Sequence, residues 1–432
     1  MRYTPPSSDL FVINRRNFMK KMKPGTMAVF FSNDMMVDNA DGHYRFRQNS
    51  NTYYLSGIDQ EKTILVLFPD APKKEWQEML FILKTSELIQ IWEGWKYSME
   101  EATQASGVQT VRYFETFRSF IKNIISQTEG IYLDFNEHER NALFTPTHAH
   151  RFAQELKDEF PAHPLFRAAP VLEDLRSIKS KWEIAQLQEA INITEKAFRR
   201  VLNFVKPGVT EYEIEAEITH EFLRNKATGH AYEPIIASGR NACVLHYIDN
   251  CLPCKKGDLI LMDFGAEYGN YSADLSRVVP VDGVFTKRQK EVYNAVLRVH
   301  KAAVQMLTPG TLLEAYHKEV GKLMEAELLA LKLITKTDIK NQKPQQPAYT
   351  KYFMHGTSHF LGLDTHDVGN RYKPFKEGMV FTCEPGIYIL EENIGIRIEN
   401  DILVSRKGPI DLMKNIPIEA DEIESIMQAK RK

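Results

Sequence analysis

The sequence predicts an α/β domain followed by an α+β domain, with the boundary near residue 175. Before that point, short apolar runs typical of buried strands alternate with helical segments. After it, two helix pairs are each followed by strand-rich sequence. A chain of 432 residues is long enough for more than one domain with a substantial core. We therefore expect two domains, at 1–175 and 176–432.

The first domain contains three apolar runs bounded by polar or turn residues. These runs predict strands at TMAVFF (26–31), TILVLF (63–68) and EMLFILK (78–84). Helical stretches are predicted at 14–22 and 116–126. Because strands and helices alternate, a largely parallel or mixed sheet is favoured.

The second domain begins with apolar residues at helical spacing over 184–205, and the Pro-Gly pair at 207–208 ends this helix. Thr210 and Glu213 then form a capping box for the next helix. The same order recurs about 100 residues later, where a helix, a Pro-Gly pair and a helix-opening Thr311 follow in turn. The repeat predicts two similar halves with a site between them. Chance is the alternative, since Pro-Gly is common after helices.

Composition and charge exclude some classes of partner. The chain is 43% hydrophobic and 26% charged, as globular proteins are, and its net charge of −2 gives no reason to expect nucleic acid or a membrane surface. No apolar run is long enough to cross a bilayer, and the first residues lack the layout of a secretory signal, so a cytoplasmic protein is expected. Four cysteines, including the Cys251–Cys254 CxxC, are too few for a disulfide framework, and reduced thiols are expected.

The clearest local signal is a hairpin at 258–281, where two strand-like runs flank a Tyr-Gly-Asn turn. A turn centred between Tyr268 and Gly269 would place Asp263 directly opposite Asp274. Opposed carboxylates weaken a hairpin unless something offsets their charge. Asp263 also interrupts an apolar run, so burial is expected. We favour a bound divalent cation over the alternative of two solvated aspartates.

Two more carboxylates lie in similar settings. Glu384 ends the apolar run MVFTCE, and Glu399 lies in the strand-like run NIGIRIEND, on the same face as Arg397. Each alone could form a strand-end salt bridge. Together with the two aspartates they would supply four anionic ligands.

Histidines could complete the set. His355, His359 and His366 fall within twelve residues of a glycine-punctuated segment, and His246 follows a loop-like stretch. A helix could present His355 and His359 on one face, but a loop-and-strand geometry is at least as compatible with the glycines. An oxygen-rich site favours Mn²⁺, with Co²⁺, Fe²⁺ or Zn²⁺ as alternatives, over a structural zinc bound by thiolates. Four carboxylates carry more charge than one divalent ion needs, so two ions are predicted.

These motifs resemble those of the pita-bread metallopeptidases, which include methionine aminopeptidase, prolidase and aminopeptidase P. The family's metal ligands are Asp, Asp, His, Glu and Glu in chain order. The matching positions are Asp263, Asp274, His359, Glu384 and Glu399. The resemblance implies a pita-bread fold for the second domain. It also assigns His246, His355 and His366 to the substrate pocket and makes Glu384 a proton shuttle.

The N-terminal part resembles the start of aminopeptidase P in the segment YRFRQNSNTYYLSGIDQEKTILVL (44–67). Arg397 and Tyr388 match pocket residues of the same branch. The resemblance implies that the first domain helps build a homodimer or homotetramer and lends residues to a neighbouring pocket, with Asp41 and Trp92 at matching positions. The polar stretch 336–352 departs from the family, and a loop near the site entrance is expected there.

The resemblance implies release of the N-terminal residue from peptides with proline in second position. A metal-bridging hydroxide would attack the carbonyl before proline, and Glu384 would pass a proton to the leaving nitrogen. The metals and His366 would stabilise the oxyanion. A prolidase, which cleaves Xaa-Pro dipeptides, shares the ligands and is the nearest alternative. A non-catalytic pita-bread binding module is a third possibility, disfavoured by the complete ligand set.

Overall fold

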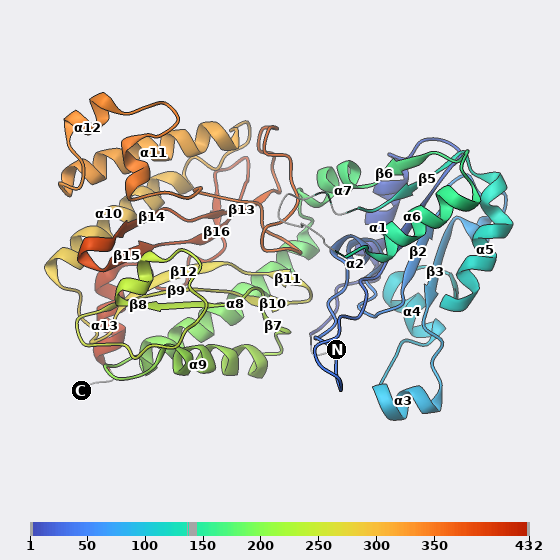
Figure 1. The fold of residues 1–432 in the computed structure, drawn as a ribbon, viewed down its shortest axis with the longest axis horizontal. Helices are drawn as coiled ribbons and strands as arrows, with labels where there is room; N and C mark the ends of the chain where they lie inside the picture. Colours follow the sequence, from blue (N-terminus) through green and yellow to red (C-terminus); the bar gives the residue numbers. More distant parts are fainter. Residues whose placement is uncertain (1–2, 136, 138–144, 430–432) are drawn as a thin grey trace. The chain divides into compact units, whose positions relative to one another are not determined.

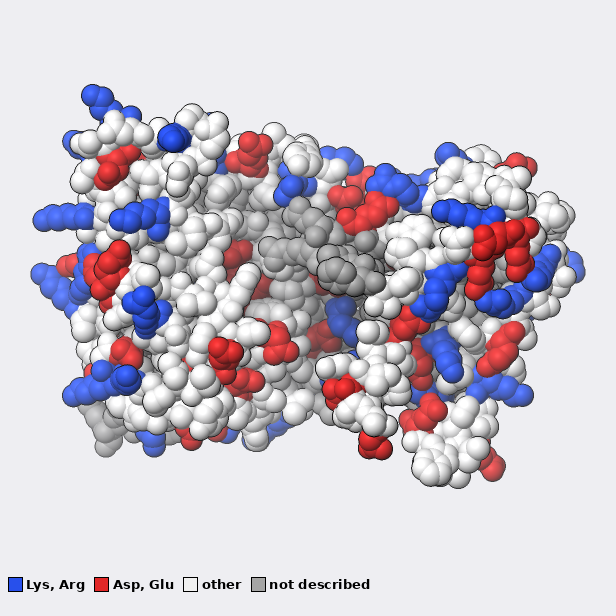
Figure 2. Space-filling view, in the orientation of Figure 1, with Lys and Arg blue, Asp and Glu red and all other residues white. Residues whose placement is uncertain are grey.

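The computed structural model describes residues 3–135, 137 and 145–429. The chain forms two compact units, an N-terminal unit of residues 5–176 and a C-terminal unit of residues 177–432 together with 1–4. None of the helices in the described ranges combines the length and apolar character needed to span a bilayer. Basic and acidic side chains are interspersed on the face drawn in Figure 2.

A six-stranded mixed sheet forms the centre of the N-terminal unit (Figure 1). Its strands, in order across the sheet, are β4 (Thr110–Tyr113), β3 (Glu78–Ile82), β2 (Ile64–Leu67), β1 (Thr26–Phe31), β5 (Gly130–Leu133) and β6 (Leu165–Arg167). The pairs β1–β2 and β2–β3 are antiparallel and the others parallel. The helices are α1 (Ser8–Met19), α2 (Ser50–Ser56), α3 (Glu87–Glu93), α4 (Met99–Ser106), α5 (Phe117–Ile124), α6 (His148–Glu159) and α7 (Ala169–Arg176). The three predicted strands are present as β1, β2 and β3.

Strand β1 is buried on both faces. Phe30 contacts Phe18 of α1, with ring centroids 5.2 Å apart. On the opposite face, Phe31 packs against Phe117 of α5 and Phe152 of α6. A strand covered on both sides is apolar at every position, which explains the continuous run TMAVFF.

The predicted helix at 14–22 is wrong in its bounds. Helix α1 begins at Ser8, because the Ser7 side chain accepts a hydrogen bond from the Asp9 backbone and caps the helix. The helix predicted at 116–126 corresponds to α5, which has a 3₁₀ turn at each end.

Among the described residues, the C-terminal unit has two helix pairs, three three-stranded sheets and one two-stranded sheet. In Figure 1 its strands lie between the pair α8–α9 and the pair α10–α11. The helices are α8 (Lys181–Phe204), α9 (Glu211–Arg224), α10 (Lys287–Val304), α11 (Leu313–Ala330), α12 (Lys336–Asn341) and α13 (Ala420–Ala429). One three-stranded sheet has the order β12 (Leu275–Pro280), β9 (Leu259–Phe264), β8 (Ile235–Ser238), and a second has the order β13 (Val380–Cys383), β16 (Asn400–Leu403), β17 (Ile410–Asp411). The third has the order β11 (Tyr271–Ser272), β10 (Ala266–Tyr268), β7 (Gly229–His230), and the two-stranded sheet joins β14 (Gly386–Ile389) with β15 (Ile394–Arg397).

The helix starts in this unit agree only partly with the sequence. Thr210 and Glu213 form the predicted capping box of α9. The second pair differs, because Leu312 is the residue before α11. The Thr311 hydroxyl instead donates to the carbonyl of Met306, two residues after the end of α10.

The expectation of a loop over 336–352 is also wrong. Residues Lys336–Asn341 form α12, and Ala348–Lys351 form a 3₁₀ turn. The helix begins there because Thr335 and Asp338 form a capping box.

The hairpin register differs from the one predicted. Strands β9 and β12 pair Asp263 with Ser276, so Asp263 does not face Asp274. The tight turn is Gly269-Asn270, with φ of +59° and +67°. A two-residue hairpin turn of this kind needs a positive φ at both central residues, which glycine and asparagine accept more readily than tyrosine. The error is two residues, so Asp274 stays on the predicted face, diagonal to Asp263.

Candidate metal centre

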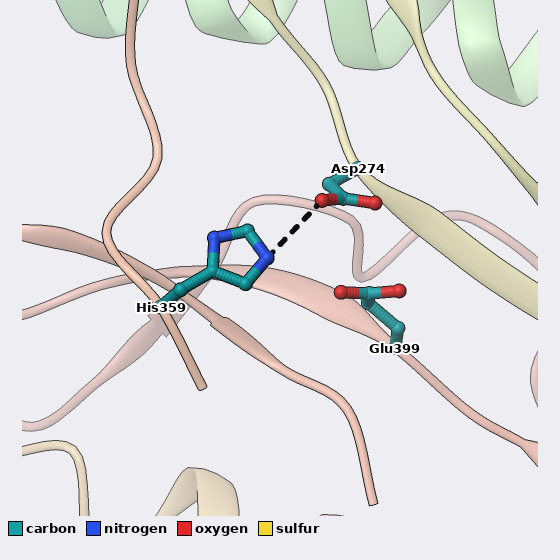
Figure 3. A group of neighbouring side chains, drawn as sticks. All are labelled: Asp274, His359 and Glu399. Carbon is teal, nitrogen blue, oxygen red and sulfur yellow. Dashed lines mark ion pairs between the residues drawn. The ribbon is translucent and has the colours of Figure 1, made fainter. Parts of the chain in front are cut away.

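Carboxylates and an imidazole from separate segments meet in the C-terminal unit. Ligand atoms of Asp274, His359 and Glu399 lie within 4.8 Å of one another, and Figure 3 shows their polar ends pointing together. His359 Nε2 is 3.4 Å from Asp274 Oδ2 and 3.6 Å from Glu384 Oε1. Asp263 joins the group through the Tyr232 hydroxyl, which lies 2.6 Å from one oxygen of each aspartate. The five residues of the sequence motif are therefore neighbours.

The backbone near strand ends positions these side chains. The carboxylates lie within or beside strands, Asp263 in β9, Asp274 before β12, Glu384 after β13 and Glu399 between β15 and β16. His359 is in a loop that lies alongside β13 and is bonded to Thr382 of that strand. The Thr382 hydroxyl accepts a hydrogen bond from the His359 N–H, and the Thr382 N–H donates to the His359 carbonyl. Of the two geometries that the sequence left open, the loop is observed, and His355 and His359 are not on a helix.

Gly265 allows the two aspartate-bearing strands to come close. A Cβ at this position would lie 1.7 Å from the Ala273 carbonyl oxygen, so no larger residue fits. The close approach brings Asp274, which follows Ala273, toward Asp263. The side chain of Asp263 is only 14% exposed.

The cluster carries more negative charge than its surroundings compensate. Burial raises the pKa of Glu384 to about 7, and burial together with the charge of Asp274 raises the pKa of Glu399 well above its usual range. Burial alone would lower the pKa of His359, but its bond to Asp274 and the charge of Glu384 raise that pKa to about 9. Buried carboxylates in mutual repulsion are stabilised by a cation. The oxygen-rich donor set with one imidazole thus fits a hard divalent metal.

Ser276 and Arg397 hold the carboxylates of Glu399 and Asp263 through hydrogen bonds. The Ser276 hydroxyl donates to Glu399 Oε2 at 2.6 Å and accepts from Arg397 Nε at 2.9 Å. Arg397 Nη2 donates to Asp263 Oδ2 at 2.6 Å. Both ends of this bridge are buried, so each charged group has a fixed partner.

Two residues of this arrangement were not found from the sequence. Ser276 is the cross-strand partner of Asp263, and a turn placed at Gly269-Asn270 would have identified it. Tyr232 lies outside every motif considered, and no local pattern marks it.

The pocket histidines have different environments. His355 Nε2 is 2.8 Å from the Tyr388 hydroxyl, which in turn accepts from Arg397 Nη1 at 2.9 Å. Burial, and next the charge of Arg397, lowers the pKa of His355 to about 3. His366 stacks on His359, with ring centroids 3.8 Å apart. His246 is exposed on a turn, and its charge contributes to the lowered pKa of His355.

Asp41 and Trp92 belong to the N-terminal unit. Asp41 lies in an exposed turn, where its N–H donates to the Asn39 side chain. Trp92 is on α3 and is 81% exposed.

Comparisons with known proteins agree with this architecture. Residues 185–406 match "Metallopeptidase family M24", and residues 11–132 match "Aminopeptidase P, N-terminal domain". The chain is 32% identical to the Xaa-Pro aminopeptidase of Escherichia coli (strain K12), over 98% of each chain, and 33% identical to that of Haemophilus influenzae, over 96% of each. A solved structure of aminopeptidase P from E. coli with the inhibitor Pro-Leu aligns with a TM-score of 0.89 at 31% identity, covering 99% of this chain and 100% of the other. The predicted α/β domain followed by a pita-bread domain is confirmed, and the chain belongs to metallopeptidase family M24.

Proposed function

We propose that this chain hydrolyses peptides with proline in second position and releases the N-terminal residue. The observation that carries the proposal is the buried cluster of carboxylates around His359, in a chain similar to Xaa-Pro aminopeptidases over nearly its whole length. A cluster of this composition is unfavourable without cations. It is therefore best explained as a site for metal-dependent hydrolysis.

The proposed ligands are the five residues of the motif. They are Asp263, Asp274, His359, Glu384 and Glu399. We propose two ions, with Mn²⁺ preferred over Co²⁺, Fe²⁺ or Zn²⁺, because four carboxylates exceed the charge of one divalent ion. When bound, the ions would supply Lewis acidity to polarise the scissile carbonyl and to acidify water.

Glu384 is proposed to move the proton. Its Oε1 lies 3.6 Å from His359 Nε2 and its Oε2 lies 3.7 Å from His355 Nδ1. It thus stands between the ligand cluster and a pocket histidine. From there a carboxyl group can accept a proton from the attacking water and return it to the leaving proline nitrogen.

His355 is proposed to orient the peptide as a neutral ring. The Tyr388 hydroxyl accepts from Arg397, so its own proton is directed to His355 Nε2. The ring proton of neutral His355 is then on Nδ1, which lies 2.8 Å from the Gly356 carbonyl. This chain of donors fixes the tautomer and the position of the ring. His246 and His366 are proposed to contact the peptide, and Arg397 and Tyr388 to line the proline side.

The N-terminal domain is proposed to support a homodimer or homotetramer. On α3, Leu88, Ile91 and Trp92 are 65%, 77% and 81% exposed, and apolar residues so exposed favour a protein partner. We propose that Asp41 and Trp92 support a pocket in a second copy. Light scattering coupled to size exclusion tests this, because Trp92→Ala should reduce the oligomer while a change at exposed Tyr113 should not. A cytoplasmic location stays a prediction.

The activity assay compares substrate classes. Metal-free protein is loaded with Mn²⁺ and given Xaa-Pro-Xaa tripeptides, Xaa-Pro dipeptides and Xaa-Ala-Xaa tripeptides. We expect cleavage of the first class. Cleavage of dipeptides alone would identify a prolidase, and cleavage of no peptide would favour a binding module. Asp421→Asn, at a carboxylate 86% exposed, is the control for Asp274→Asn.

A further inference from the structure

A buried ion pair lies beside the candidate metal centre and takes no part in the proposed chemistry. Lys179 Nζ donates to Asp367 Oδ2 at 2.9 Å, and each side chain is 1% exposed. The two residues are 188 positions apart in the sequence. Burying two charges costs desolvation that their attraction often fails to offset, so such a pair is poor as a means of stabilising a fold. A role in fixing a particular geometry would explain why it is there.

Asp367 closes the loop that carries His366. The Asp367 N–H donates to the Phe360 carbonyl at 2.9 Å, and Phe360 forms a bridge to Phe381 of β13. The first bond closes the segment from 360 to 367 on itself, and the bridge attaches its Phe360 end to β13. The loop is therefore anchored to the strand that directly precedes the proposed ligand Glu384.

Packing inside the loop leaves little room for another arrangement. A Cβ at Gly362 would lie 2.2 Å from Asp367 Oδ2 and 2.9 Å from the Lys179 side chain. The Gly362 carbonyl accepts the Ser272 N–H at 2.9 Å, which links the loop to β11 of the hairpin that carries Asp274. The ion pair thus fills the space beneath the loop.

Lys179 is itself held from another direction. Its backbone N–H donates to the Gly378 carbonyl at 2.8 Å, just before β13. Burial raises the pKa of the Glu183 carboxyl, and the nearby charge of Lys179 opposes that rise. The Tyr271 hydroxyl donates to Glu183 Oε1 at 3.2 Å. Lys179 is consequently held both at its backbone N–H and at its ammonium group.

The residue next to Asp367 is His366, which stacks on His359 with 3.8 Å between ring centroids. A shift of the Asp367 backbone would move this ring relative to the ligand cluster. We propose that the Lys179–Asp367 pair is a positioning device that holds His366 against His359 for the reaction. The proposal rests on the proposed function insofar as it assigns His366 to the reaction.

The test uses Lys179→Met and Asp367→Asn, with the double variant Lys179→Met/Asp367→Leu. We expect kcat for an Xaa-Pro-Xaa tripeptide to fall about 100-fold in each single variant, the usual effect of displacing a reacting group by about 1 Å. KM and metal content should change little. The double variant removes both charges, so its Tm should recover while kcat stays low. Recovery of kcat together with Tm would show a purely structural pair and overturn the proposal.

A double-mutant cycle with His366→Gln isolates the route of the effect. If Lys179 acts through His366, then Lys179→Met should not lower kcat further in the His366→Gln background. Additive losses would overturn the proposal. Leu328→Ala, in the core of α11, is the control for lost stability, and its kcat should stay at the wild-type value. If Lys179→Met fails to fold, Gly362→Ala displaces the Asp367 carboxylate with both charges retained.

Nuclear magnetic resonance separates this proposal from the proposed function. The stacked His366 ring should have a Cε1–H resonance shifted by the ring of His359, identified by its loss in His366→Gln. That shift should disappear in Lys179→Met. A wild-type chain that cleaves no peptide would refute the function but leave this readout valid, whereas an unchanged resonance in Lys179→Met would refute the positioning role.

Discussion

Ser276→Ala tests how the candidate ligand cluster is held. The serine is fully buried in β12, and its hydroxyl joins Glu399, at 2.6 Å, to Arg397, at 2.9 Å. Alanine removes both hydrogen bonds and leaves two buried charged groups each without one partner. A hydrogen bond to a charged group stabilises a fold by about 1.5–3 kcal/mol, so we expect the free energy of unfolding to fall by about 3–6 kcal/mol.

Ser238 supplies a matched control in the same sheet. Its hydroxyl donates to Glu211 Oε1, also at 2.6 Å, but Glu211 is no proposed ligand. Ser238→Ala should cost about 1.5–3 kcal/mol and leave metal binding unchanged. Ser276→Ala should in addition weaken Mn²⁺ binding by about 10–100-fold, the usual effect of removing a group that orients a ligand.

Two measurements decide the outcome. Urea denaturation gives the free energy of unfolding, and calorimetric titration of Mn²⁺ into metal-free protein gives Kd. If Ser276→Ala loses stability as expected but binds Mn²⁺ with the wild-type Kd, then the serine does not orient Glu399, and the reasoning is refuted.

Three further predictions follow from single positions. Asp274→Asn should abolish hydrolysis and lower the metal content measured by elemental analysis, and near-normal activity would contradict a two-ion site. Burial lowers the pKa of His300 to about 3, so the folded state excludes a proton that the unfolded chain binds below about pH 6.5. The free energy of unfolding therefore keeps this contribution in full above that pH and is lower by about 2 kcal/mol at pH 5. His300→Gln should remove this part of the pH dependence in urea titrations. Gly269→Ala, at φ +59°, should cost about 1–2 kcal/mol by the same assay, and an unchanged midpoint would argue against the turn assigned here.

Local patterns predicted the elements that depend only on neighbours in the chain. The run TMAVFF is buried on both faces, and the capping box of Thr210 and Glu213 begins α9. Ser7 and the capping box of Thr335 and Asp338 are also local signals, and the bounds predicted without them are wrong. The starts of α1 and α12 therefore depend on residues adjacent in the chain and not on tertiary contacts.

Local patterns predicted only part of the candidate site. Its carboxylates and His359 stand in recognisable motifs, and period-two alternation was enough to place Asp263 and Asp274 on one face. Their register depended on which two residues adopt a positive φ, and the choice of Tyr268 and Gly269 over Gly269 and Asn270 displaced it by two.

The sequence by itself determined the kinds of element, the motif residues and the chemistry that their carboxylates favour. Tertiary structure alone decided that Tyr232 lies between two aspartates, that Ser276 joins Glu399 to Arg397, and that Lys179 meets Asp367. The physical reason is that propensity and periodicity act over a few residues. A partner 188 residues away is set by how sheets and loops pack, which no local pattern records.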